Sequence, residues 1–201
     1  MAFFSDQQVL RAAAVSVGET TRSMTEFKAT AALNDLRPRV PEAVESGSPV
    51  KTFDIFLSYS SLDATMVLGI YQILLKKGYS VYLDRTCDPH LHGLPVSKAT
   101  ATTIRRRMPQ CRSLFVATSS RTTSSQWVPW ELGVTDGLTG KAAVLPILPD
   151  GTVSFGGPAY FELHPAVQDN PTVSKSNDLT IWDGSSLIGT WGTWLAMAKR
   201  Y

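Results

Sequence analysis

The sequence predicts an α/β protein with a parallel sheet that is covered by helices on both faces. From residue 53 onward, apolar segments of strand length alternate with segments of helical periodicity. The strand segments are nearly continuous in apolar residues, as expected for strands buried on both faces. With 201 residues, 43% hydrophobic and 18% charged, the chain can bury one sizeable core.

Composition and charge exclude several classes of function. The formal net charge of +2 is too small to indicate nucleic-acid binding. No apolar run approaches the roughly 20 residues that span a bilayer, so no membrane partner is expected. Two cysteines, Cys87 and Cys111, are too few for a disulfide scaffold and fit a reducing cytoplasm. His90 and His92 bring too few further ligands for zinc, so we expect neither a metal nor a cofactor.

Residues 1–50 are predicted to form a short helical N-terminal extension and a linker, and residues 51–201 the main domain. An alanine-rich stretch begins at Val9, and Ser23 with Glu26 has the spacing of a capping box, so we expect two short helices. A linker is indicated by three prolines: Pro38, Pro41 and Pro49. The helices pack on the main domain or on a partner, or the segment is an unstructured tail; the sequence leaves these alternatives open.

Five strands are expected in the main domain, because five short runs are rich in β-branched, aromatic or other apolar residues. They are residues 53–59, 79–84, 113–118, 142–148 and 179–182. Residues 149–176 carry many Gly, Pro and Ser residues and are expected to form a long irregular loop.

Helices are expected between these strands. Met66, Ile70 and Leu74 form an apolar stripe that ends at Gly78, a typical helix stop. The expected helices run from Ser60 to Lys77, from Lys98 to Met108, from Ser124 to the glycines at 137 and 140, and from Ile188 to Lys199. The tryptophans of the last helix, Trp191 and Trp194, are expected to pack against the sheet.

Trp127 and Glu131 form a candidate catalytic pair. Residues four apart on a helix share a face, so the indole and the carboxylate would point into the same space. Ser124 or Ser125 can cap this helix, whereas Pro129 suits only its opening. If the helix begins only at Pro129, Trp127 precedes it and the shared-face argument weakens. The structural alternative is that Trp127 belongs to the core and Glu131 is a first-turn acid that the helix dipole favours.

The pair is expected at the ligand-binding edge of the sheet. In open parallel sheets, ligands bind at the carboxyl ends of the strands, and the Trp127–Glu131 stretch begins just beyond the third strand. The ends of the first two strands carry Tyr59, Ser60, Ser61 and Asp84. No GxGxxG follows the first strand and no Walker A motif is present, which disfavours classical dinucleotide binding and P-loop chemistry.

Three motifs in order resemble those of the Toll/interleukin-1 receptor (TIR) domain family. The first is FDIFLSYS at residues 53–60, and the second is the strand ending in Tyr-Leu-Asp at residues 82–84 with the turn-rich loop that follows. The third is WVPWE at residues 127–131, which matches the WxxxE signature of enzymatically active members. The resemblance covers residues 53–148 closely and the remainder loosely. It implies a flavodoxin-like fold with a five-stranded parallel sheet.

The resemblance further implies an enzyme, an NAD⁺ glycohydrolase or cyclase, for which NAD⁺ is the substrate and not a cofactor. Glu131 would be the catalytic glutamate, and Trp127 would lie near the nicotinamide. An ionised Glu131 is expected, because the positive end of the helix dipole favours the charged form. The nucleotide cleft would be lined by Tyr59, Ser60, Ser61 and Asp84. Eukaryotic NAD-cleaving relatives often carry arginines where Ser60 and Ser61 stand, so other groups must contact the phosphates here.

The sequence leaves the product open, since water would yield ADP-ribose and an intramolecular acceptor a cyclic ADP-ribose-type nucleotide. The chain is similar to the small prokaryotic TIR proteins of anti-phage systems such as Thoeris, in which such a signal activates a separate effector. A cytoplasmic protein is therefore implied. Because family members complete their sites by assembly, we expect self-association through the loop from Arg85 to Pro95.

Two other functions remain open. One is a non-enzymatic TIR interaction module, either an adaptor or a factor that interferes with host signalling. Its contacts would come from the loop between Arg85 and Pro95 and from the basic helix over residues 98–108. The other is a flavodoxin-like phosphoacceptor with Asp84 at its centre. A receiver domain also needs an acidic pair after the first strand, where this chain carries Ser-Tyr-Ser at residues 58–60.

Overall fold

A computed structural model of the chain describes residues 3–36, 53–59, 64–87, 97–119, 125, 127–152, 155–170 and 178–198. The strands are β1 (Phe4–Ser5), β2 (Phe53–Tyr59), β3 (Val81–Tyr82), β4 (Cys111–Ser119), β5 (Ala142–Leu148), β6 (Ala166–Gln168), β7 (Thr180–Asp183) and β8 (Ser186–Thr190). The helices are α1 (Asp6–Ser16), α2 (Glu26–Asp35), α3 (Ala64–Lys76), α4 (Asp84–Cys87), α5 (Lys98–Arg107), α6 (Trp127–Thr139) and α7 (Trp191–Ala196), with 3-10 helices η3 (Met108–Gln110) and η4 (Ala159–Leu163).

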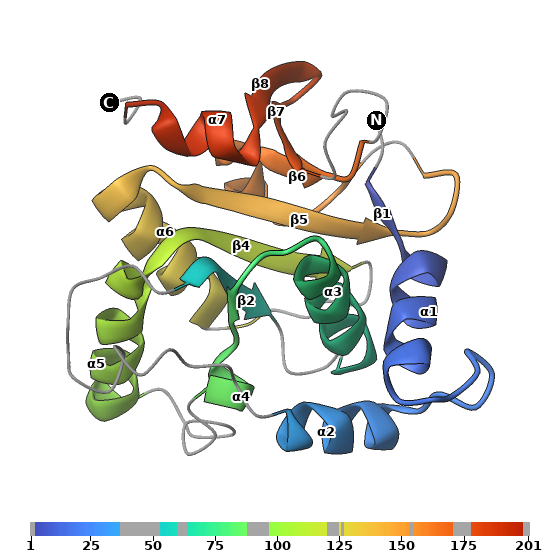
Figure 1. Ribbon diagram of the computed structural model, residues 1–201. Helices are drawn as coiled ribbons and strands as arrows, with labels where there is room; N and C mark the ends of the chain where they lie inside the picture. Colours follow the sequence, from blue (N-terminus) through green and yellow to red (C-terminus); the bar gives the residue numbers. More distant parts are fainter. Residues whose placement is uncertain are drawn as a thin grey trace.

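The central sheet has the strand order β3-β2-β4-β5-β6-β7-β8, and β1 pairs with the end of β5 (Figure 1). The pairs from β3 through β6 are all parallel. The prediction of an α/β protein with a parallel sheet between helices is therefore confirmed. The carboxyl ends of β2 and β4 lie side by side, because Tyr59 is in register with Ala117.

The edge of the sheet beyond β5 differs from the prediction of five parallel strands. The fifth parallel strand is β6, a three-residue strand within the stretch expected to be an irregular loop. The segment expected as the last parallel strand is β7, which pairs antiparallel with β6 and with β8. Residues 186–190 form β8 and not the start of the last helix, which begins at Trp191.

A tight turn explains the extra strand pair. Asp183 pairs with Ser186, so two residues connect β7 to β8, and Gly184 adopts a φ of 55° between them. A connection this short can join only antiparallel strands, and a glycine with positive φ at the first of the two turn residues is favoured in it. The Gly-Ser pair at residues 184–185 was therefore a hairpin signal in the sequence, but β6 is too short to show a periodic pattern.

Two hydrophobic clusters form the core, one on each face of the sheet. From Ile55 onward, the side chains of β2 alternate between them, because successive residues of a strand point to opposite faces. Ile55 and Leu57 belong to the cluster beneath α1, α2, α3 and α7. Phe53 and Phe56 belong to the cluster beneath α5 and α6. This alternation decides which residues of β2 can meet the helix that carries Glu131.

The N-terminal segment packs on the main domain, one of the arrangements that the sequence left open. Phe4 of β1 pairs with Ile147 of β5 and is fully buried. The α1 and α3 helices approach so closely that a Cβ atom added to Gly69 would lie 2.1 Å from the carbonyl oxygen of Val9. The predicted boundary at residue 50 and the proline linker lie outside the described residues.

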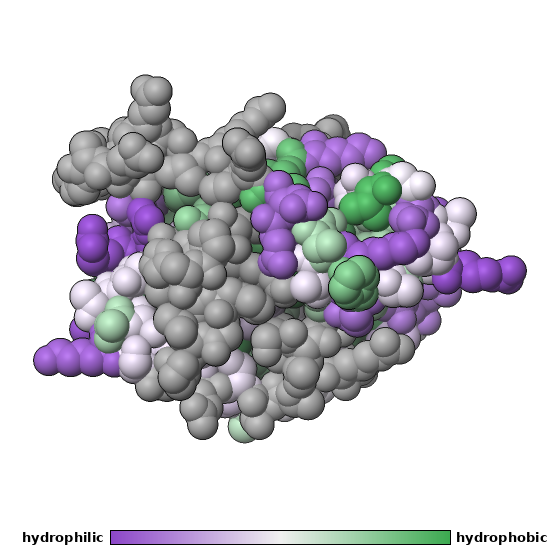
Figure 2. Space-filling model, turned by 90° about the horizontal axis from the view of Figure 1, so that it is seen from below, coloured by the Kyte–Doolittle hydropathy of each residue, from purple (hydrophilic) through white to green (hydrophobic). Residues whose placement is uncertain are grey.

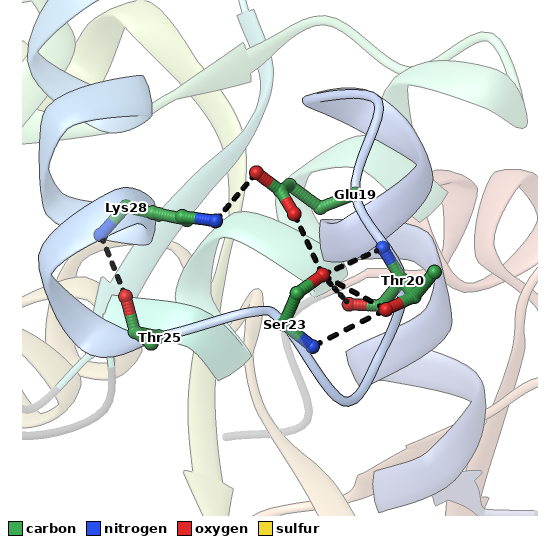
Figure 3. Close-up of polar contacts among 5 residues, drawn as sticks. All are labelled: Glu19, Thr20, Ser23, Thr25 and Lys28. Carbon is green, nitrogen blue, oxygen red and sulfur yellow. Dashed lines mark hydrogen bonds and ion pairs between the residues drawn. The ribbon is translucent and has the colours of Figure 1, made fainter.

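The turn between α1 and α2 carries a local polar network (Figure 3). Ser23 donates a hydrogen bond of 2.6 Å to Glu19, and Glu19 also pairs with Lys28 at 2.5 Å. The hydroxyl of Thr25 accepts from the backbone N–H of Lys28 and caps α2. The predicted cap at Ser23 is therefore wrong by two residues, because Ser23 is engaged in the preceding turn.

The α2 helix buries only one side. Ala29 and Leu33 are fully buried, whereas Phe27 is 83% exposed. In Figure 2, which views the molecule from the side of α2, the hydrophobic residues form separate spots among hydrophilic ones where the described surface is visible. Phe27 is thus exposed to solvent and does not belong to the core.

Two smaller predictions concern individual side chains, and both are confirmed. Trp191 and Trp194 are buried in the cluster beneath α7, which confirms their packing against the sheet. Cys87 and Cys111 are free thiols. Among the described residues, no helix is long and apolar enough to cross a bilayer.

Candidate active site

The α6 helix begins early enough to carry both residues of the candidate pair. The hydroxyl of Ser125 accepts from the backbone N–H groups of Trp127 and Val128, at 3.2 and 3.3 Å. Pro129 is the third residue of the helix, within the first turn, where a backbone N–H has no acceptor inside the helix. The alternative in which the helix starts only at Pro129 is therefore wrong. Trp127 and Glu131 lie one turn apart on the same helix.

Glu131 is a buried carboxylate held by a strand residue. Its side chain is 6% exposed, and its Oε2 accepts a hydrogen bond of 2.6 Å from the Oγ of Ser58. Ser58 is the next-to-last residue of β2 and lies on the same face of the sheet as Phe56. The carboxylate thus lies at the carboxyl end of the central strands, where parallel sheets bind their ligands.

Burial raises the pKa of Glu131 to about 7, because the charged carboxylate loses its water. The hydrogen bond from Ser58 lowers this pKa, and the negative charge of Asp84 raises it. The expectation that the helix dipole would keep Glu131 ionised therefore requires correction. Desolvation outweighs the dipole, and near pH 7 the two protonation states have similar populations.

Trp127 belongs to an aromatic stack at the start of α6. Its ring contacts Trp130 edge to face, with the centroids 5.4 Å apart. The guanidinium of Arg105 in α5 lies over the Trp130 ring, 5.6 Å from its centroid. Trp127 remains half-buried against the cluster beneath α5 and α6. The structural alternative, a core tryptophan, is therefore only partly right, because part of the ring stays accessible.

The other predicted site residues are not all brought together. Asp84 opens α4 and is near enough for its charge to act on Glu131. Tyr59 packs against the cluster on the opposite face of the sheet, because it follows Ser58 by one residue. Ser60 and Ser61 lie outside the described residues, as does most of the loop from Arg85 to Pro95.

Ser58 is the site residue that sequence reasoning missed. The sequence predicted a site built from the polar residues at the end of β2 and beyond it. The contact to Glu131 instead comes from Ser58, within the strand. One signal was available: Ser58 is the hydroxyl within the apolar run from Ile55 to Tyr59, at the strand position two residues after Phe56. A polar residue buried at such a position needs a partner. The identity of that partner depends on how α6 lies across β2.

A cavity of about 740 Å³ lies elsewhere, beside α1 and the end of α3. It has a volume typical of ligand sites, but none of the predicted site residues lines it. Among its charged side chains, Lys77 pairs with Asp169 at 2.8 Å. Glu131 remains the candidate catalytic residue, because a buried carboxylate with a raised pKa is a stronger indication of a functional site than a cavity alone. The described residues contain no group of three potential metal ligands.

Comparison with known proteins gives two relatives. The chain is 44% identical over 137 residues to the "Probable 3' cyclic ADP-D-ribose synthase ThsB'" of Bacillus cereus (strain MSX-D12), and this covers 68% of this chain and 70% of that protein. It is 29% identical over 83 residues to a protein of Cytobacillus dafuensis whose name includes "cyclic ADP-D-ribose synthase TIR2". That match covers 41% of this chain but only 22% of the Cytobacillus protein.

The family comparison agrees with the geometry. The TIR domain family matches residues 55–172, more than half of the chain, from β2 to just beyond β6. This range contains Ser58, Asp84, Trp127 and Glu131. With a parallel sheet between helices and a buried glutamate at its carboxyl edge, the chain belongs to the TIR domain family.

Proposed function

We propose that the chain cleaves the bond between nicotinamide and ribose in NAD⁺, releases nicotinamide and closes the remainder into a cyclic ADP-ribose-type nucleotide. The observation that carries this proposal is the buried Glu131 on α6, one turn from the half-buried Trp127. Both relatives carry names of cyclic ADP-D-ribose synthases, which favours cyclisation over simple hydrolysis.

One carboxylate is enough for this reaction. Ordinary glycoside hydrolysis commonly uses two carboxyl groups, because the leaving oxygen must be protonated. The nicotinamide of NAD⁺ is already a cation and leaves as a neutral ring when the bond electrons move to its nitrogen. The ribose carbon then carries the positive charge. Ionised Glu131 stabilises this charge and accepts hydrogen bonds from the ribose hydroxyls.

Substrate binding favours the ionised form of Glu131. Its pKa of about 7 in the free protein leaves the carboxylate only partly ionised at neutral pH. The positive nicotinamide ring lowers this pKa when it binds beside the carboxylate, because an opposite charge nearby stabilises the anion. Burial keeps competing water away and strengthens the attraction between carboxylate and ribosyl cation.

Trp127 orients the leaving group. A flat cationic ring binds favourably against an indole face, and the edge-to-face contact with Trp130 limits the rotation of Trp127. Asp84, whose charge reaches Glu131, is proposed to line the nucleotide side of the cleft. Tyr59, Ser60 and Ser61 are proposed to contribute to the same cleft from the end of β2.

The product forms when an acceptor on the same molecule attacks the ribose carbon. An adenine nitrogen or a ribose hydroxyl of the ADP-ribose portion adds to that carbon and, if it carried a proton, releases it to solvent. Water in the same position gives ADP-ribose instead. Exclusion of water by the buried site favours the intramolecular acceptor.

Nicotinamide release from NAD⁺, measured for the wild type, Glu131→Gln and Glu162→Gln, tests the proposal. Glu162 is an exposed glutamate of η4 and provides the matched control. We expect release by the wild type and Glu162→Gln and a loss of about 10²-fold or more in Glu131→Gln. Mass spectrometry of the product separates cyclic from linear nucleotides. Intact NAD⁺ with all three proteins would overturn the proposal and favour a non-enzymatic interaction module, an adaptor or a factor that interferes with host signalling.

The product is proposed to act as a signal in anti-phage defence, by activating a separate effector in the cytoplasm. Similarity to ThsB' supports this role. We further propose that the chain self-associates through the loop from Arg85 to Pro95 and that assembly completes the site. Specific activity should then rise with protein concentration, and activity that is independent of concentration in a monomer would contradict the assembly.

A further inference from the structure

The hydroxyl of Ser58 and the carboxylate of Glu131 form a buried polar pair at the carboxyl end of the sheet. Ser58 is 2% exposed and Glu131 6%, and their oxygens lie 2.6 Å apart. This distance falls in the range of hydrogen bonds to an ionised oxygen, which are stronger than those between neutral groups. The two residues are 73 positions apart in sequence and come from β2 and α6.

The bond has consequences for the orientation of the carboxylate. A serine hydroxyl has one proton to donate, and here it is donated to Oε2 of Glu131. With Oε2 engaged, the rotation of the carboxylate is restricted. Ser58 is itself fixed by strand pairing, because it is in register with Val116 of β4. The orientation of Glu131 is therefore set by the sheet and not by α6 alone.

We propose that Ser58 is a positioning residue that orients Glu131 and favours its ionised form. The inference rests on the proposed function, since it assigns Ser58 to the site of NAD⁺ cleavage. Ser58 does not contact the reacting atoms in this proposal. Without its hydroxyl, the buried carboxylate loses a donor that stabilises its charge and becomes protonated at higher pH.

Within the described part of the chain, Ser58 is the hydrogen-bond donor resolved at the Glu131 carboxylate. Among the described residues, Asp84 of α4 is the charged group whose interaction with Glu131 is resolved, and its negative charge acts against ionisation. The guanidinium of Arg105 in α5 lies over the Trp130 ring, and no effect of its charge on the pKa of Glu131 is resolved. Ser58 therefore supplies the polar contact that favours the carboxylate.

The experiment compares Ser58→Ala with Ser58→Cys and Ser113→Ala. Ser58→Ala removes the donor, and Ser58→Cys keeps a weak donor of similar shape. Ser113 is the matched control: it is also a 2% exposed serine of a central strand, but its hydroxyl donates to the backbone carbonyl of Asp54 and accepts from the indole N–H of Trp191. Ser113→Ala therefore removes buried serine hydrogen bonds without touching Glu131.

The first readout is the pH profile of nicotinamide release. In Ser58→Ala we expect kcat to fall about 10-fold with a smaller change in KM. We also expect the acidic limb of the profile, where activity falls with decreasing pH, to shift by about one unit toward higher pH. Ser58→Cys should fall between Ser58→Ala and the wild type. Ser113→Ala should keep the acidic limb in place. An unchanged limb in folded Ser58→Ala would overturn the proposal, because a purely structural role lowers the amount of active protein without moving the limb.

A second readout does not depend on turnover. Titration of the Glu131 carboxyl carbon by NMR reports its pKa directly, and comparison with Glu131→Gln assigns the signal among the six glutamates. The titration should move to higher pH in Ser58→Ala, or in Ser58→Cys if the alanine variant does not fold, and an unmoved titration in the folded variant refutes the inference. If the wild type releases no nicotinamide, the proposed function fails, while this titration still decides whether Ser58 controls the ionisation of Glu131.

Discussion

Ser58 of β2 donates a 2.6 Å hydrogen bond to Glu131 of α6, and both side chains are buried. The contact joins the first motif of the family to its glutamate. It exists because successive side chains of β2 point to opposite faces of the sheet. Ser58 therefore faces the helices α5 and α6, while Tyr59 packs against the cluster on the other face. The bond lowers the pKa of Glu131 but does not offset burial, which raises this pKa to about 7.

The activity should depend on pH through Glu131. Because the ionised carboxylate is the working form and its pKa lies near 7, kcat/KM for NAD⁺ should rise with pH across the range of about 6 to 8 and then level off. Below pH 6 it should fall about 10-fold per unit. Initial rates of nicotinamide release in buffers of constant ionic strength test this. A flat profile from pH 5 to 8 would show that Glu131 does not act as a titrating carboxylate.

Glu131→Gln should stabilise the protein at high pH. The pKa of Glu131 is raised from 4.5 to about 7 by folding, so its contribution to stability is present below pH 4.5 and lost as pH rises to 7. The loss amounts to roughly 3 kcal/mol at most, since one unit of pKa corresponds to about 1.4 kcal/mol. A glutamine has no charge to bury and avoids this loss.

Thermal unfolding of the wild type and Glu131→Gln at pH 5 and pH 8 measures the effect. The melting temperature of the variant should exceed that of the wild type by several degrees at pH 8, with a smaller difference at pH 5. Glu162→Gln, at an exposed position, should show no such dependence on pH. A variant less stable than the wild type at pH 8 would contradict the cost assigned to the buried charge.

Gly69→Ala should destabilise the packing of the N-terminal segment. The new Cβ would lie 2.1 Å from the carbonyl oxygen of Val9, and a backbone atom cannot move aside without shifting α1. We expect a loss of about 1–3 kcal/mol in the free energy of unfolding. Gly137→Ala on α6 is the control, since its Cβ meets nothing within 4 Å and should stabilise the helix by about 0.5–1 kcal/mol. Urea unfolding distinguishes the two, and equal effects would argue against the close α1–α3 contact.

Trp127→Ala should weaken the binding and orientation of the nicotinamide. The indole is held against Trp130, so its removal leaves the leaving group without an aromatic wall. A loss of about 10- to 100-fold in kcat/KM is expected. Trp127→Phe keeps a flat ring and should retain most of the activity. If the alanine and phenylalanine variants were equally impaired, bulk or helix stability would be the role of Trp127, and not its aromatic face.

Sequence alone determined the α/β class, four of the parallel strands (β2 to β5), and the residues of the candidate pair. These features follow from local patterns, because apolar strands, helical stripes and the WxxxE spacing are all visible within a few residues. The last strands were misjudged for the same reason. A strand as short as β6 carries no periodic signal, and the direction of β7 depends on its partners.

Tertiary structure alone decided the state and surroundings of Glu131. Its partner Ser58 is 73 positions away, and its burial results from the packing of α6 on the sheet. The sequence suggested an ionised glutamate at a helix start, since the dipole is a local property. Desolvation is not local: it depends on every chain segment that excludes water from the carboxylate. The position of Tyr59 is also decided by the tertiary structure. It follows Ser58 by one residue in β2, so its side chain lies on the face of the sheet opposite Glu131.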